Sequence, residues 1–85
     1  MIIRLTTLLL SNNTITRISN DIGNQLKNLK ALILTNNRIV NLAEVGYLSG
    51  LTNLEHLSLL DNPVTFKVII DYLIIIIIIY YYLYN

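Results

Sequence analysis

The segment LKALILTNNRI, residues 29–39, decides the fold of this chain. It follows the template Leu-x-x-Leu-x-Leu-x-x-Asn-x-(Ile or Val). The same template is filled by LTTLLLSNNTI at residues 5–15 and by LEHLSLLDNPV at residues 54–64. The copies begin 24 and then 25 residues apart, so one unit is written three times.

The template predicts a short strand followed by a turn. In x-Leu-x-Leu-x the two leucines point to the same side, because side chains alternate along a strand. A period of about 20–29 residues with this pattern is typical of leucine-rich repeats. We therefore predict an α/β leucine-rich-repeat solenoid of three repeats over residues 1–67. Its short parallel strands line a concave face, and short helices or 3₁₀ turns form the convex face.

One asparagine follows each predicted strand, at the point where the chain turns away: Asn13, Asn37 and Asn62. The amide can bond backbone groups that the turn exposes in its own and the neighbouring repeat. Buried polar groups need such partners. We interpret the three residues as a structural asparagine ladder.

The segments between the strands are predicted to return along the convex side. A spacing of three and four predicts a buried helical face formed by Ile18, Ile22, Leu26 and Leu29. A spacing of three predicts a short helix or 3₁₀ turn with Leu42, Val45, Leu48 and Leu51. Asn20 or Asp21 could cap the first segment and Asn41 the second. The glycines expected to keep these helices short are Gly23, Gly46 and Gly50.

Composition excludes several classes of function. The net charge is +1 and the Lys and Arg residues never cluster, which is too weak for an electrostatic nucleic-acid footprint. The sequence contains no cysteine, which favours a reducing compartment, and no signal peptide is visible. We find no metal cluster, paired acids or phosphate-binding glycine loop, so we expect no cofactor.

Hydrophobic residues make up 54% of the 85 residues, but the excess lies in a low-complexity Ile/Tyr tail at residues 68–85. As a membrane span, its 17 residues from Val68 to Tyr84 are near the lower limit and include Asp71. As a capping helix it lacks a polar face. We favour a third hypothesis, non-native sequence, because Ile, Tyr and Asn codons are rich in A and T. An uncharged β-branched run is in any case prone to aggregate.

The outward strand positions form the predicted binding surface. They lie before, between and after the two inward leucines of each repeat: Thr7, Leu9, Ser11, Ala31, Ile33, Thr35, His56, Ser58 and Leu60. A small apolar patch with a polar rim suits the docking of a partner helix. The alternative is that isolated apolar residues on a sheet surface are normal.

His56, Ser58 and Asp61 invite comparison with a catalytic triad. Residues two apart on a strand lie about 6–7 Å apart. That is too far for the hydrogen bond between a nucleophile and its base. We predict that the chain is not an enzyme.

Two stretches, LILTNN at residues 32–37 and LSLLDNPVT at residues 57–65, resemble the U2 small nuclear ribonucleoprotein A-prime family of the spliceosome. The likeness runs from Leu5 to about Lys67 and includes the repeat spacing. The segment NPVTFK, residues 62–67, is its most specific part.

This resemblance implies a nuclear scaffold for pre-mRNA splicing. Such a scaffold binds the RNA-recognition domain of a B-double-prime partner, and the pair holds U2 small nuclear RNA. The resemblance also implies further repeats upstream and a basic, tyrosine-containing helix and cap after Lys67, where this chain has the isoleucine run. Two alternatives stay open. They are another intracellular adaptor, of phosphatase-regulatory or dynein-associated type, and a membrane-anchored repeat protein.

Overall fold

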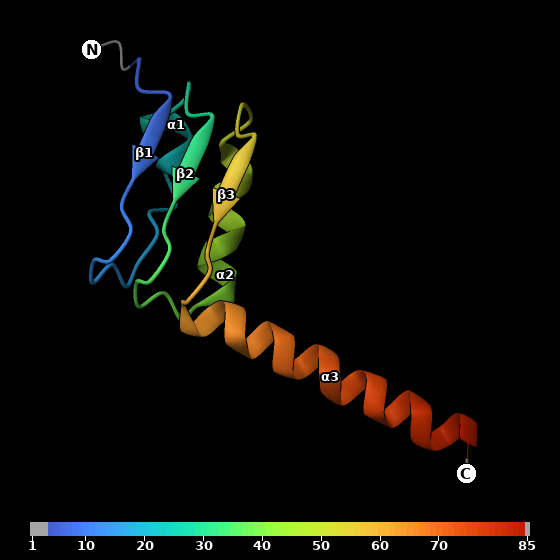
Figure 1. Cartoon of the computed structure of the whole chain (residues 1–85). Helices are drawn as coiled ribbons and strands as arrows, with labels where there is room; N and C mark the ends of the chain where they lie inside the picture. Colours follow the sequence, from blue (N-terminus) through green and yellow to red (C-terminus); the bar gives the residue numbers. More distant parts are fainter. Residues whose placement is uncertain (1–3, 85) are drawn as a thin grey trace.

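The computed structural model describes residues 4–84 and confirms the predicted leucine-rich-repeat solenoid, with one long helix leaving it (Figure 1). A three-stranded sheet forms one layer and the short helices form the other. The elements in chain order are β1 (Thr7–Leu9), α1 (Ile22–Gln25), β2 (Ala31–Ile33), α2 (Leu42–Val45), the 3₁₀ helix η1 (Gly46–Gly50), β3 (His56–Ser58) and α3 (Pro63–Tyr84).

The strands are parallel and lie in the order β1-β2-β3. The template leucines Leu8, Leu32 and Leu57 are direct partners across the sheet. Because the template positions align, the extra residue of the second repeat interval lies in the convex segment. The unequal spacing therefore does not shift the strand register.

The core lies between the sheet and the convex segments. Leu29, Leu32 and Ile39 are its largest fully buried side chains. Equivalent leucines are buried to different extents: Leu32 on β2 is 1% exposed, while Leu57 on β3 is 45% exposed. The reason is that β2 has a strand on both sides, whereas β1 and β3 are the edges of the described sheet.

Each strand is followed by one residue in the left-handed backbone region. These residues are Asn12, Asn36 and Asp61, with φ of 61°, 57° and 57°. Asn and Asp tolerate this region better than most residues because their short polar side chains bond locally. The Asn36 amide also donates to the Asn12 side-chain oxygen at 2.9 Å, which links two turns on the surface. Sequence analysis did not anticipate a left-handed residue directly before each ladder asparagine.

The first convex segment differs from its prediction. Only the four residues of α1 are helical, although Ile18 and Leu29 are buried as expected. The side-chain cap predicted at Asn20 or Asp21 is wrong: Asp21 precedes α1 without capping its backbone. Its carboxylate accepts from the side chain of Asn24 at 2.7 Å instead.

The second convex segment follows its prediction more closely. Asn41 caps α2 by accepting from the backbone N–H of Ala43 at 2.9 Å. Leu48 and Leu51 are buried, but Leu42 is exposed, against the predicted periodicity. Leu42 stands at the start of α2, where it lines an open apolar hollow beside Val68 of α3.

Gly23 lets the two convex segments pack closely. A Cβ atom at Gly23 would lie 2.5 Å from the backbone oxygen of Gly50, nearer than such atoms approach. We expected these glycines to limit helix length. The structure adds a steric role for Gly23, because α1 and η1 meet backbone to backbone there.

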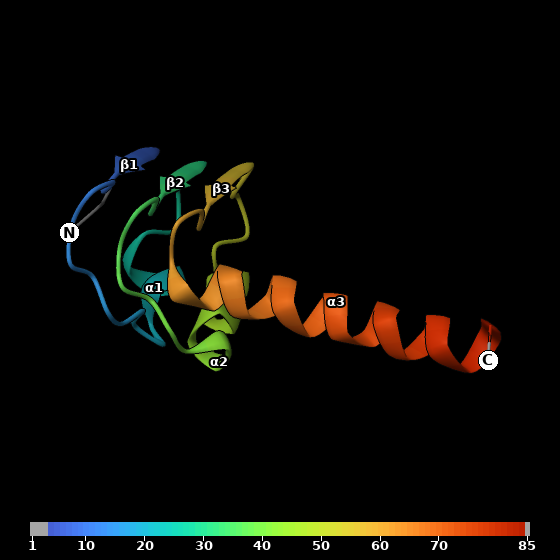
Figure 2. The ribbon, with the colours of Figure 1, turned by 60° about the horizontal axis from the view of Figure 1, so that its bottom comes forward.

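Helix α3 begins at Pro63, a residue favoured at the first helical position. It runs without interruption across the boundary we expected between Lys67 and Val68. Val64 is buried in the solenoid, whereas residues 66–83 are exposed. Figures 1 and 2 show α3 extending away from the sheet and the convex helices. The molecule is therefore elongated, with dimensions of 61 × 24 × 19 Å.

Candidate concave binding face

The predicted outward positions lie side by side on the sheet. The register aligns Thr7, Ala31 and His56 in one row. It aligns Leu9, Ile33 and Ser58 in the next row. Backbone bonds continue beyond the strands, from Asn12 N to Thr35 O at 3.0 Å and from Asn36 N to Leu60 O at 2.9 Å. The register therefore brings six of the nine predicted residues into two adjacent rows, and backbone bonds continue the sheet to Thr35 and Leu60.

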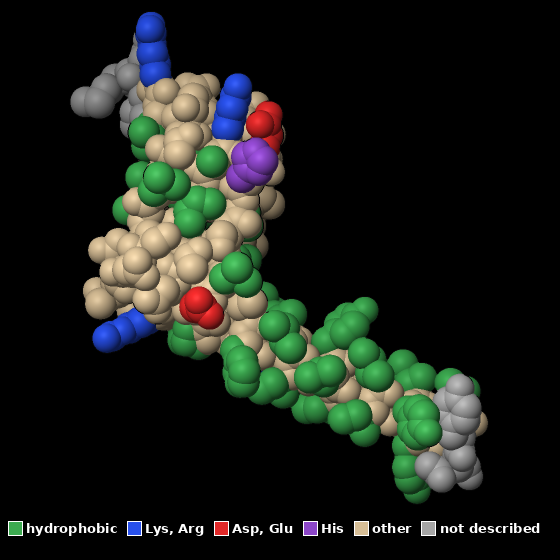
Figure 3. Space-filling model, in the orientation of Figure 1, with side chains coloured by type: hydrophobic (Ala, Val, Ile, Leu, Met, Phe, Trp, Pro, Cys, Tyr) green, Lys and Arg blue, Asp and Glu red, His purple; other side chains and the backbone are tan. Residues whose placement is uncertain are grey.

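The apolar members of this surface differ in exposure. Leu9 is 69% exposed and Leu60 is 62% exposed, while Ile33 between the outer strands is partly buried. We call Leu9, Ile33 and Leu60 the concave patch. In Figure 3, which views the sheet side, hydrophobic side chains lie on the solenoid among polar ones, with charged groups towards its two ends. Uncharged polar side chains lie among the patch residues, and the acidic Asp61 directly follows Leu60.

Hydroxyl groups order one side of the concave patch. The Thr35 and Ser58 hydroxyls lie 2.7 Å apart and share a hydrogen bond. The Ser58 oxygen also accepts from the backbone N–H of Leu60 at 3.4 Å. These bonds occupy Ser58 within the sheet surface, and His56 is exposed at the next row. Within residues 4–84, His, Cys, Asp and Glu residues form no group of three able to hold a metal.

The ladder asparagines lie behind this face. The Asn37 amide donates to the carbonyls of Leu34 and Leu10, at 2.9 and 3.0 Å, and its oxygen accepts from Ile15 N at 3.1 Å. Asn62 repeats the arrangement one repeat later. Both side chains therefore join their own turn to the preceding repeat.

Asn13 departs from the expected ladder. It is exposed, and its amide donates to the carbonyls of Leu10 and Ser11, both in its own repeat. No strand stacks on the outer side of β1 within the described residues. Asn13 consequently stabilises the turn of its own repeat and does not bond a neighbouring repeat within the described residues.

A buried carboxylate that the sequence analysis did not single out also joins two repeats. Glu44 of α2 accepts from the backbone N–H of Ile18 at 2.9 Å and from Arg17 Nε at 3.0 Å. The Ile18 N–H bond is the main cause that lowers the pKa of Glu44 below its usual range, and Arg17 adds to the effect against the opposing influence of burial. Little in the sequence indicated this role, because Glu44 stands among the apolar residues predicted for the convex face.

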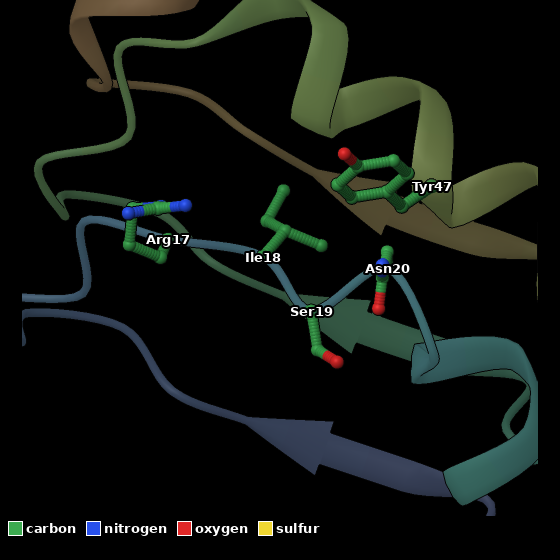
Figure 4. Close-up of a pocket in the computed structure, with 5 residues that line it drawn as sticks. All are labelled: Arg17, Ile18, Ser19, Asn20 and Tyr47. Atoms are coloured by element: carbon green, nitrogen blue, oxygen red, sulfur yellow. The ribbon is translucent and has the colours of Figure 1, made fainter.

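One open hollow lies away from the sheet surface, between the segment after β1 and η1. Arg17, Ile18, Ser19, Asn20 and Tyr47 line it, as Figure 4 shows. Arg17 and Tyr47 stand at its two flanks, and Ser19 points away from Ile18. Because Arg17 is held by Glu44, its charge serves the contact between repeats. We assign no ligand to this hollow.

Comparison with known proteins agrees with this architecture. The family model described as "Leucine-rich repeat" matches residues 1–80. The chain belongs to the leucine-rich-repeat family.

Individual proteins similar to this leucine-rich-repeat chain share one name. The U2 small nuclear ribonucleoprotein A' of Arabidopsis thaliana is 53% identical over 64 residues, which are 75% of this chain and 26% of that protein. The Homo sapiens protein of the same name is 48% identical over 64 residues, covering 75% of this chain and 25% of the relative. The resemblance noted in the sequence is therefore confirmed.

A solved structure matches the fold of this leucine-rich-repeat chain as well. A chain in the crystal structure of the Drosophila melanogaster SNF/U2A' complex superposes with a TM-score of 0.69 and 48% identity. The match covers 73% of this chain and 36% of that one. This leucine-rich-repeat chain thus spans about a quarter of the length of the curated relatives it matches.

Proposed function

We propose that this chain is a non-catalytic scaffold of the U2 small nuclear ribonucleoprotein that docks a partner protein on its concave face. The partner carries an RNA-recognition domain of the B-double-prime type, and the pair acts in the nucleus in pre-mRNA splicing. The observation that carries the proposal is the concave patch, built on a parallel sheet from residues of all three repeats. Similarity to U2 A' proteins, and to a chain from a SNF/U2A' complex, supports it.

The chemistry of the concave patch favours an apolar helix as the docked element. A helix can present apolar residues at intervals of three and four to a groove of this kind. Leu9 and Leu60 are exposed leucines at opposite edges of the sheet, with Ile33 between them. The hydroxyls of Thr35 and Ser58 form part of a polar rim, which excludes water from the centre of an interface.

The charge distribution bears on how U2 small nuclear RNA is held. The net charge of this chain is +1, and none of the nine outward positions carries Lys or Arg. Phosphate contacts by such residues supply much of the affinity of nucleic-acid binders. We therefore infer that this chain reaches the RNA mainly through its partner.

The test is a pull-down of a B-double-prime-type protein with wild-type chain and with Ile33→Asp. An unpaired carboxylate buried at the centre of the interface loses apolar contact and is desolvated. We expect a fall in affinity of about a hundredfold or more. Val40→Asp is the control, because Val40 is β-branched like Ile33 and is exposed, but it lies outside the concave patch.

Each outcome has a defined meaning once circular dichroism shows that the variants are folded. Loss of binding by Ile33→Asp and retention by Val40→Asp support the proposal. Equal binding by all three chains rules out the concave patch as the docking site. If no chain binds the partner, the intracellular adaptor hypothesis replaces the spliceosomal one.

A further inference from the structure

An open hollow lies at the edge of the sheet where the strands begin. It has a volume of about 400 Å³ and is lined by Arg4, Thr6, Asn28, Lys30 and Asn53. The backbone N–H of Lys30 donates to the carbonyl of Thr6 at 2.7 Å, so the first two repeats meet there. Arg4 and Lys30 lie about one repeat apart in the chain. The stacking of the repeats therefore brings together two cations that are separate in the sequence, and we call this site the cationic hollow.

The charges of the cationic hollow have no acidic partner. Arg4 and Lys30 are exposed, and the ion pair found among residues 4–84 joins Arg17 to Glu44 instead. Glu55 begins the next strand, where its backbone N–H donates to the Lys30 carbonyl, but it does not line the hollow. Figure 3 shows Lys and Arg side chains at the end of the sheet where the strands begin. The hollow thus suits an anionic group.

The cationic hollow adjoins the concave face. Thr6 and Lys30 directly precede Thr7 and Ala31, which form the first row of that face. The row that contains Ile33 follows two residues later, about 6–7 Å along the strand. An α-helix with its side chains is about 10–12 Å across. A helix docked on the concave patch therefore brings the side chains of one flank to the hollow.

We propose that the cationic hollow binds acidic side chains of the partner that docks on the concave patch, an inference that rests on the proposed function. Arginine holds a carboxylate through two parallel hydrogen bonds, and lysine adds a compact positive charge. Beyond the other edge of the patch, Asp61 directly follows Leu60. Complementary charges fix the register of an interface and disfavour wrong partners. Cations before the patch and an acid after it therefore select one orientation of the docked helix.

A partner carboxylate fits the cationic hollow better than an RNA phosphate does. Proteins that bind nucleic acids strongly neutralise several phosphates with Lys and Arg. The lining of the hollow contains two such residues, Arg4 and Lys30. The hollow also continues the surface that docks a protein. The carboxylate is therefore the assigned ligand, and the experiments separate it from phosphate.

The first experiment measures binding of a B-double-prime-type protein in the absence of RNA. The double variant Arg4→Gln and Lys30→Gln should bind about threefold to tenfold more weakly than wild type at low salt. At about 1 M salt, where charges are screened beyond about 3 Å, this difference should largely disappear. Arg38→Gln with Lys67→Gln is the matched control, because it removes two exposed cations outside the hollow.

The second experiment identifies the ligand chemically. A carbodiimide joins a carboxylate to an amine in direct contact, forming an amide while the reagent takes up the water that is lost. We expect mass spectrometry of the complex to find Lys30 joined to an Asp or Glu of the partner. Lys30→Arg keeps the charge, so it should retain binding and lose this cross-link.

The outcomes separate this inference from the docking proposal. If Ile33→Asp abolishes binding while the double variant binds like wild type at low salt, the cationic hollow is not a partner site and the docking proposal stands. If partner binding is unchanged but the assembled pair binds U2 small nuclear RNA more weakly, the hollow holds phosphate and the inference is overturned. If the wild-type chain does not bind the partner, both proposals are overturned.

Discussion

The middle and first repeats fill the same template, yet they are stabilised differently. Asn37 is buried and bonds two repeats, whereas Asn13 is exposed and bonds only its own turn. Leu32 is 1% exposed, and its partner Leu8 is only partly buried. The template residues are the same in both repeats, so the difference in their burial comes from the number of neighbouring strands. In a solenoid of this kind, burial is a property of the stack rather than of the repeat.

The largest effect should come from the central leucine. Leu32→Ala removes a fully buried side chain and leaves a cavity, so we expect a loss of about 2–5 kcal/mol in the free energy of unfolding. Leu57→Ala changes the same template position but should cost only about 1 kcal/mol, because Leu57 is already half in water. Urea denaturation followed by circular dichroism measures both. Equal losses would contradict the dependence on neighbours.

The ladder should show the same contrast between repeats. Asn37→Ala leaves the Ile15 N–H and the Leu10 and Leu34 carbonyls without their partner, at about 1–3 kcal/mol. Asn13→Ala removes bonds at an exposed turn and should stay within about 0.5 kcal/mol. Thermal melts of the two variants provide the comparison. An unchanged midpoint for Asn37→Ala would remove Asn37 from the ladder.

The contact between convex segments offers a sterically matched pair. Gly23→Ala places a methyl group against the Gly50 backbone, so the two segments must separate, at about 1–3 kcal/mol. Gly46→Ala meets nothing within 4 Å and has a helical backbone, so it should stabilise by up to about 1 kcal/mol. Opposite signs in the urea midpoints are the expected result. Destabilisation by both would mean that the convex contact is not what constrains Gly23.

The smallest effect should be the dependence on pH of the link between the first two repeats. Because the folded state lowers the pKa of Glu44, the carboxylate contributes stability above its ordinary pKa and loses it as the pH falls through the folded value. Wild type should therefore lose more of its urea midpoint than Glu44→Gln between about pH 5 and pH 3. Since both chains share every other acid, their difference isolates Glu44. A constant difference across this range would exclude the link.

Residues with a fixed periodicity could be predicted well from the sequence. Leu8, Leu32 and Leu57 are equivalent in the template and are partners in the sheet. Alternation along a strand then places Ile33 and Ser58 on the opposite surface, where the structure has them. These features depend only on the spacing of residues along the chain, which can be taken directly from the sequence.

Features that depend on contacts between distant segments were missed. Glu44 lies 26 residues from its partner Ile18, and no local pattern marks that pair. Gly23 was assigned to helix shortening because its neighbour Gly50 becomes apparent only when the repeats are stacked. The start of α3 at Pro63 was hidden, because Pro63 and Val64 also complete the template of the third repeat. Overlapping signals of this kind are resolved only by the three-dimensional packing.

The constant strand register has a consequence for protein engineering. Because β1, β2 and β3 pair without offset although the repeats differ by one residue in length, the convex segment absorbs that difference. A duplicate of residues 29–53 inserted between β2 and β3 would therefore meet complementary strands on both sides. Each inserted unit would add one inter-repeat interface of the kind that now surrounds β2. The chain can in this way serve as a cassette for solenoids of chosen length, in which each added cassette widens the concave surface by one strand.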